Sequence, residues 1–369
     1  MYTENKITAR ENYAHYSQTL NRSQAFGAKR RVALSSFIAF ALLSMMFLDG
    51  VSPAHGQTET ILYEFQLGVD DGTNPDGGLV LGKKGNMYGA TFLTGDFGSG
   101  GIYEVFADGG EVPLYSFNPP TDGASSQGSL AVDKSGNLYG ANCAGGKFDL
   151  GTVYKLSPAN VFTVLHNFTG KADGSCPTGS MVADAAGNLD GTAFRGGKAN
   201  SGTIFKLTPA GKLTTTYAFA GGADGGFPQG GMALGAKGYL YGTTLQGGAF
   251  NEGTLFRVSL AGVHTVFWNF TGGADGSEPN GNVIFDKHGH ICGTTLIGGD
   301  FGRWLIYVAW ANTLTKIYSF ADSTDGALPG PVVRDKQGNL YGTTQGGGTN
   351  FLGTVFEVKL TPSVTKTIL

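Results

Sequence analysis

Six aspartates at nearly constant spacing are the residues of this chain most suited to chemistry. Each begins an Asp-Gly dipeptide, at Asp71, Asp122, Asp173, Asp224, Asp275 and Asp325, in steps of 51, 51, 51, 51 and 50 residues. Carboxylates are hard oxygen donors, so a ring of them could bind calcium or a polar ligand. Alternatively, each aspartate caps its own Asp-Gly turn. Calcium loops usually gather several carboxylates within about a dozen residues, whereas each repeat here supplies one, which favours the turn.

Positions where one repeat differs from the others are further candidates for a functional site. The fold alone would accept the residue that the other repeats share, so a different residue there can have another purpose. Asp190 stands where most repeats have tyrosine, and it could act as a carboxylate near a central channel. The fifth repeat contains "FGRWLIYVAW", which adds Arg303, Trp304 and Trp310. Exposed tryptophan beside arginine could form a sugar or peptide platform. Drift with core repacking is the alternative, because aromatic side chains are usually buried.

Other catalytic or metal-binding patterns have little support. His288 and His290 lie in the turn "DKHGHIC", but a zinc site needs three or four converging ligands. We therefore expect solvated histidines and no metal centre. The sequence has no Gly-x-Ser-x-Gly elbow, no Cys-His pairing and no phosphate loop, so nucleophilic catalysis is not indicated.

The elements that would position these residues are short strands. Between Gly128 and Phe168, one copy reads "GSLAVD", "NLYGAN", "GTVYKLS" and "FTVLHNF", four alternating apolar runs separated by turn residues. The first two runs are joined by Asp-x-x-Gly-Asn, which is typical of a tight hairpin. Each copy is thus a four-stranded antiparallel meander, and a period of about 50 is that of a propeller blade. Six copies from about residue 60 onward predict an all-β, six-bladed β-propeller.

Ring closure is predicted from one phenylalanine that ends the fourth strand. It occurs at Phe117, Phe168, Phe219, Phe270 and Phe320, but the sixth copy ends at Leu369 without it. The segment "TETILYEF" carries Phe65 at the matching place. We therefore expect residues 60–66 to supply the outer strand of the last blade. Residues 364–369 would be displaced or add a marginal extra edge.

Three cysteines are expected to form one disulfide and one buried thiol. Cys143 follows the second strand of its blade, and Cys176 follows the fourth strand of the same blade. These two loops emerge on the same face of a meander, so a Cys143–Cys176 disulfide is allowed. Cys292 replaces a strand tyrosine, which favours burial.

The N-terminus predicts export. Residues 1–56 contain "KRR", the apolar run "VALSSFIAFALLSMMFL" and small residues before Gln57, the order of a secretory signal. Its length also allows an uncleaved membrane anchor. The propeller then comprises residues 57–369, with 19 basic and 25 acidic residues and a net charge of −6. This charge disfavours a nucleic-acid partner.

The repeated phrase resembles the GloVer tandem repeat of bacterial exported proteins. Matching stretches are "GNLYGTTQGGGTNFLGTVFEVKL", "GYLYGTTLQGGAFNEGTLFRV" and "GNLYGANCAGGKFDLGTVYKL". The "LAVDKSGNLYG" half is also similar to NHL-type propellers, which implies that the first strand is innermost and the phenylalanine-ending strand outermost. The loops that join blades would then share one face with the loops between second and third strands. The resemblance implies a surface-associated protein and brings no catalytic residues.

Two classes of function remain from the sequence. The first is a secreted, periplasmic or cell-surface binding or scaffolding module, expected to be a monomer without a cofactor, for a glycan or protein ligand. A purely structural surface protein is close to it. The second is a propeller enzyme, a lyase, lactonase or glycan hydrolase, with carboxylates near the channel. Its main warrant is fold analogy, which does not establish function.

Overall fold

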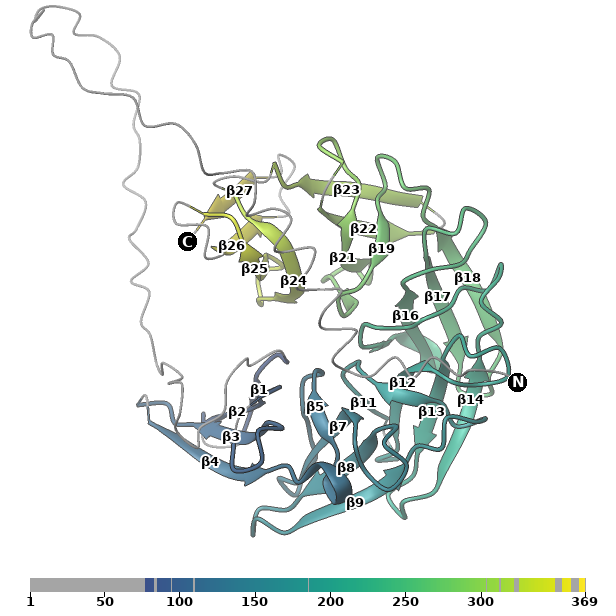
Figure 1. Ribbon diagram of the computed structural model, residues 1–369. Helices are drawn as coiled ribbons and strands as arrows, with labels where there is room; N and C mark the ends of the chain where they lie inside the picture. Colours follow the sequence, from purple (N-terminus) through teal and green to yellow (C-terminus); the bar gives the residue numbers. More distant parts are fainter. Residues whose placement is uncertain are drawn as a thin grey trace, which may run out of the picture. The chain divides into compact units, whose positions relative to one another are not determined.

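The computed structural model describes residues 77–82, 85–93, 95–108, 110–184, 186–302, 304–311, 313–321, 325–348, 354–359 and 365–368. Their strands form six antiparallel sheets that follow one another around a ring (Figure 1). The protein is therefore a six-bladed β-propeller, as the repeat predicts. The expected signal lies outside the described residues. Among the residues that are described, no helix is long and apolar enough to cross a membrane.

The first three blades contain β1 to β14. Blade 1 has β1 (Val80–Leu81), β2 (Met87–Ala90), β3 (Gly101–Val105) and β4 (Glu111–Ser116). The short helix α2 (Pro119–Asp122) precedes blade 2, which has β5 (Ala124–Ser126), β6 (Ala131–Val132), β7 (Leu138–Ala144), β8 (Thr152–Leu156) and β9 (Phe162–Asn167). Blade 3 has β10 (Ser175–Pro177), β11 (Val182–Ala183), β12 (Leu189–Arg195), β13 (Thr203–Leu207) and β14 (Leu213–Ala218).

The last three blades contain β15 to β27. Blade 4 has β15 (Ala233–Leu234), the 3₁₀ turn η1 (Ala236–Gly238), β16 (Tyr239–Thr244), β17 (Thr254–Ser259) and β18 (His264–Asn269). Blade 5 has β19 (Ser277–Pro279), β20 (Ile284–Phe285), β21 (Ile291–Ile297), β22 (Leu305–Trp310) and β23 (Thr313–Ser319). Blade 6 has β24 (Ala327–Arg334), β25 (Leu340–Gly346), β26 (Thr354–Lys359) and β27 (Thr365–Ile368).

The hairpin turns form as the Asp-x-x-Gly-Asn pattern predicts. In blade 2, one carboxylate oxygen of Asp133 accepts backbone N–H groups from Ser135 at 2.8 Å and Asn137 at 2.9 Å. Gly136 adopts a φ of 89°, which a residue with a Cβ rarely adopts. The aspartate therefore closes the turn that joins the first strand to the second.

The innermost strand is interrupted where neighbouring blades meet backbone to backbone. In blade 3 it consists of β10 and β11, which both pair with β12. Gly179 lies in the interruption, and a Cβ built there would stand 2.6 Å from the carbonyl oxygen of Gly230 in blade 4. Glycine is needed because no side chain fits between these backbones.

Aromatic contacts between consecutive blades form the outer core. The outer-strand phenylalanines, all at most 1% exposed, each contact an aromatic ring on the third strand of the next blade. The pairs, with centroid distances, are Phe117–Tyr154 at 5.1 Å, Phe168–Phe205 at 5.4 Å, Phe219–Phe256 at 5.3 Å, Phe270–Tyr307 at 5.4 Å and Phe320–Phe356 at 5.4 Å. Five junctions thus share one contact. In blade 1 the equivalent ring is Tyr103, which is 3% exposed.

The outer strand of blade 6 differs from the expectation for the C-terminal residues. They are not displaced, because β27 pairs directly with β26 as the fourth strand, from Phe356↔Ile368 to Lys359↔Thr365. A hairpin between consecutive strands has a short loop and a small closure entropy, which favours this pairing. Its register ends opposite Phe356, and the preceding Val355 is 40% exposed. Residues 60–66, expected at this edge, lie outside the described residues.

Candidate functional site

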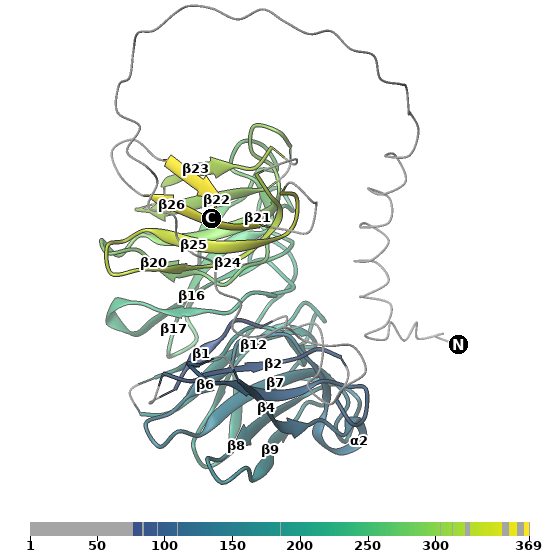
Figure 2. The same cartoon turned by 90° about the vertical axis from the view of Figure 1, so that its left-hand side faces the viewer.

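One face of the propeller gathers the loops that carry most candidate residues. The loops between second and third strands contact the links between blades, for example through Gly146 N–H to the Pro119 carbonyl at 2.7 Å and Gly197 N–H to the Lys171 carbonyl at 2.6 Å. We call this side the aspartate face, and the side with the Asp133-type turns the hairpin face. α2 lies at the edge of the strands on the aspartate face (Figure 2).

The described aspartates of the ring lie in the links between blades and accept hydrogen bonds from the end of the preceding blade. Asp224 accepts from the Tyr217 hydroxyl at 2.8 Å and from the backbone N–H of Ala220 at 2.8 Å. Every described member has the same two kinds of donor, a side chain seven residues earlier and a backbone N–H four residues earlier. The side-chain donors are Tyr115 for Asp122, His166 for Asp173, Tyr217 for Asp224, Trp268 for Asp275 and Tyr318 for Asp325.

These hydrogen bonds make the aspartates turn caps in the structure. Burial raises the pKa of Asp173, but the hydrogen bonds from Thr169 and His166 outweigh it, so its pKa is below the usual value. Within the described part of the chain, no three His, Cys, Asp or Glu side chains group to hold a metal. In Asp122 and Asp224 both hydrogen bonds go to the same carboxylate oxygen, Oδ2. Asp71 lies outside the described residues.

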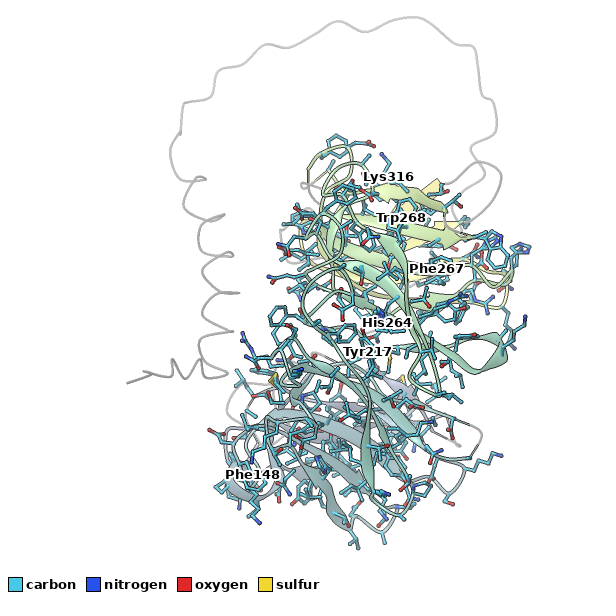
Figure 3. All side chains as sticks on the ribbon, turned by 90° about the vertical axis from the view of Figure 1, so that its right-hand side faces the viewer. Phe148, Tyr217, His264, Phe267, Trp268 and Lys316 are labelled. Atoms are coloured by element: carbon cyan, nitrogen blue, oxygen red, sulfur yellow. A yellow bond between two sulfur atoms is a disulfide. The ribbon has the colours of Figure 1, made fainter. Side chains whose placement is uncertain are left out.

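The most prominent feature of the aspartate face was not predicted: four exposed phenylalanines. They occupy the same place in four blades, and their exposed fractions are 55% for Phe97, 49% for Phe148, 58% for Phe250 and 57% for Phe301. Figure 3 shows Phe148 on its loop at the margin of the molecule. The repeated "GDFGSG", "GKFDLG", "GAFNEG" and "GDFGRW" could have revealed them.

The turns that carry these phenylalanines are clamped. Around Phe148, Asp149 N–H donates to the Gly146 carbonyl at 3.2 Å, and Lys147 N–H donates to Asn167 Oδ1 on the outer strand at 2.8 Å. The tips at Phe97, Phe250 and Phe301 have equivalent clamps through Ser116, Asn269 and Ser319. The rings are therefore presented by fixed backbones, which reduces the entropy lost when a ligand binds.

Asp190 lies in the interior and not at a ligand-accessible surface. It is 0% exposed, and the Lys206 ammonium stands 3.5 Å from it and 3.3 Å from Asp184. Burial raises the pKa of Asp190 to about 6 although Lys206 opposes the shift. A substrate cannot reach this carboxylate in the structure, so Asp190 lacks the access that a catalytic role requires.

The two tryptophans of the fifth blade do not form one platform. Trp304 is partly buried against the core that contains Phe320 and Phe356. Trp310 is 53% exposed at the other end of β22, about 20 Å away at 3.3 Å per residue. There it contacts His290, whose ring is held by Asp286 at 2.8 Å in the hairpin-face turn. Arg303 lies outside the described residues.

Two neighbouring junctions on the aspartate face are linked by different side chains at equivalent positions. The predicted Cys143–Cys176 disulfide is confirmed, but Cys176 belongs to β10, so the bond joins blade 2 to blade 3. Cys292 is buried and free, and burial raises its pKa to about 12. At the next junction, Phe194 and Phe227 take the places of the two cysteines, with their rings 5.4 Å apart.

Comparison with known families places the chain. The model of the Gloeobacter/Verrucomicrobia repeat matches residues 50–236 and 222–369. The chain belongs to this family. As a Gloeobacter/Verrucomicrobia repeat protein it has the six-fold sequence pattern seen above, which confirms the predicted resemblance. No curated protein matches this repeat protein in sequence.

Solved structures share the propeller fold with this Gloeobacter/Verrucomicrobia repeat protein. A candidate 6-phosphogluconolactonase from Bacteroides uniformis has a TM-score of 0.55 at 17% identity, with 80% of this chain and 84% of that chain covered. One from Bacteroides fragilis has 0.54 at 15%, covering 80% and 83%. The extracellular domain of a candidate one component system from B. thetaiotaomicron has a TM-score of 0.52 at 13% identity, covering 79% of this chain and 33% of that one, so this chain spans a third of its length. At these identities the likeness shows the fold alone.

Proposed function

We propose that this protein is an exported binding module whose glycan or protein ligand contacts the aspartate face. The observation that carries the proposal is the set of four clamped, half-exposed phenylalanines on one face. Water-exposed aromatic rings on rigid turns supply binding energy at low entropic cost.

Charge and location support the same proposal. The expected export signal would deliver the propeller outside the cytoplasm, and a net charge of −6 makes nucleic acid a poor partner. The enzyme alternative gains nothing from Asp190, which is enclosed. The lactonase-like neighbours resemble this chain in fold only, and fold does not carry an activity with it.

The test compares the two faces. One variant combines Phe97→Ser, Phe148→Ser, Phe250→Ser and Phe301→Ser, and its matched control combines Val161→Ser and Val263→Ser, which are 59% and 65% exposed on the hairpin face. Binding to cell-wall polysaccharides, a glycan array and envelope proteins is measured by titration, and folding by thermal unfolding.

We expect saturable binding by the unchanged protein and by the valine control, and at least about tenfold weaker binding by the phenylalanine variant. Equal binding by both variants, or no saturable binding by the unchanged protein, would overturn the proposal. Turnover of a substrate by the purified protein would support an enzyme instead.

A further inference from the structure

An arginine at the junction of blades 3 and 4 has no acidic partner among the described residues. The Arg195 guanidinium lies 5.5 Å from the Phe194 ring centroid and 5.7 Å from the Phe227 ring centroid. In the described part of the chain no carboxylate forms an ion pair with it, although the protein carries an excess of acidic residues. Its side chain is half-buried.

The scaffold does not require this charge. The equivalent residues of the other blades are Leu93, Ala144, Gln246, Ile297 and Gly346, none of which is charged. At the preceding junction a disulfide occupies the place of the Phe194–Phe227 pair, so an uncharged link suffices for the fold. Arg195 is therefore an addition to a junction that the two rings already fill.

Backbone hydrogen bonds fix the position of Phe227 at this junction. Phe227 N–H donates to the Ser201 carbonyl at 2.7 Å, and Leu245 N–H donates to the Phe227 carbonyl at 3.1 Å. Phe227 adopts a φ of +58°, a conformation that the equivalent residues of other blades share, so it belongs to the fold. This backbone conformation sets the direction in which the Phe227 ring leaves the chain, beside Arg195.

We propose that Arg195, Phe194 and Phe227 bind a carboxylate that is attached to an apolar group. The planar guanidinium can donate two parallel hydrogen bonds to a carboxylate, while the rings contact the apolar part and hold the guanidinium by cation–π attraction. The overall negative charge favours a singly charged carboxylate over a phosphate dianion or a polyanion. The inference rests on the proposed function, because it assigns one contact on the aspartate face.

The test titrates the full, purified protein with benzoate and with benzamide, its neutral analogue, by ligand-observed NMR. Arg195→Met removes the charge and leaves an unbranched apolar side chain. Arg195→Lys keeps the charge but cannot donate two parallel hydrogen bonds to one carboxylate. The matched control is Arg257→Met, because Arg257 also stands over a ring, that of Tyr239, at 5.2 Å. N-acetylphenylalanine and galacturonate then distinguish a peptide end from a sugar acid as the natural source.

We expect benzoate to bind with a millimolar Kd, about tenfold tighter than benzamide. Arg195→Met should weaken benzoate about tenfold, Arg195→Lys by less, and Arg257→Met not at all. Absence of benzoate binding, equal binding of benzamide, or unchanged binding by Arg195→Met would overturn the inference. If that happens while the face-specific binding described above persists, the proposed function stands without this contact.

Discussion

Single positions of the repeat keep one physical property while the residue type changes. The donor to the ring aspartate is a tyrosine, a histidine or a tryptophan, because only an O–H or N–H at that place is needed. Likewise the Tyr217 ring stacks on His264 (Figure 3), with ring centroids 4.4 Å apart. Tyr115 stacks on Phe162 in the same way at 4.1 Å. Such substitutions are structural equivalents and not signs of chemistry.

Asp190 is a position where the residue type and its physical property both change, because a buried carboxylate replaces the tyrosine of most other repeats. Its folded-state pKa of about 6 is above the ordinary value of 3.8, so ionisation opposes folding. The neutral Asp190 side chain therefore makes its full contribution to stability below pH 3.8, and this contribution is lost as the pH rises through about 6. Asp190→Asn cannot ionise, so we expect it to gain about 2 kcal/mol relative to the unchanged protein between pH 4 and pH 7.5.

Denaturant unfolding of both proteins at several pH values measures this difference. Titrating groups that do not interact with Asp190 contribute equally in both proteins and cancel, whereas Lys206 and Asp184 interact with it. Asp108→Asn serves as the control because Asp108 lies exposed in a turn. A stability difference that does not change with pH would show that the carboxylate of Asp190 is solvated or fully compensated by Lys206.

Outer and inner strands of a blade have different packing requirements, and these restrict which residues they can contain. The outer strands of the first five blades end in a buried phenylalanine, whereas inner strands must let neighbouring backbones approach each other. That requirement explains why the inner strand is broken into β10 and β11 in blade 3 and why glycine stands between them. The high glycine content, 62 of 369 residues, thus has a packing cause in part.

Gly179→Ala tests this explanation. The added methyl would meet the Gly230 carbonyl oxygen at 2.6 Å, so the blades must separate, and we expect a loss of about 1–3 kcal/mol. Gly222→Ala is the matched control, because a methyl there meets no atom within 4 Å. Equal unfolding free energies of the two variants would mean that the inner strands are more loosely packed than described.

At the scale of the molecule, stability depends on contacts between blades. Five junctions share the outer phenylalanine, one adds a disulfide, and one adds a pair of phenylalanine rings with an arginine beside them. β27 pairs with four of the six residues of β26, from Phe356 to Lys359, and leaves Val355 exposed, whereas the equivalent Val153 is 0% exposed. This is the edge at which we expect residues 60–66 to complete the ring.

Phe65→Ala tests ring closure. If Phe65 occupies the sixth junction against Tyr103, its loss should cost about 3–5 kcal/mol, as we also expect for Phe168→Ala. Phe148→Ala removes a ring of the same size that is 49% exposed, and should change the unfolding free energy by less than about 1 kcal/mol. A Phe65→Ala variant as stable as the Phe148→Ala variant would mean that the ring closes without this residue.

The sequence by itself determined the architecture of this protein. Its period, its strand alternation and its turn residues predict six four-stranded blades, and the cysteine positions predict the disulfide, because local patterns repeated six times leave few arrangements. Only the tertiary structure decided which side chains are accessible. It placed Asp190 inside a blade, put Trp304 and Trp310 at opposite ends of one strand, and assembled Arg195 with Phe194 and Phe227 from two blades. Accessibility and contact depend on how blades pack against one another, and a pattern within one repeat does not contain that information.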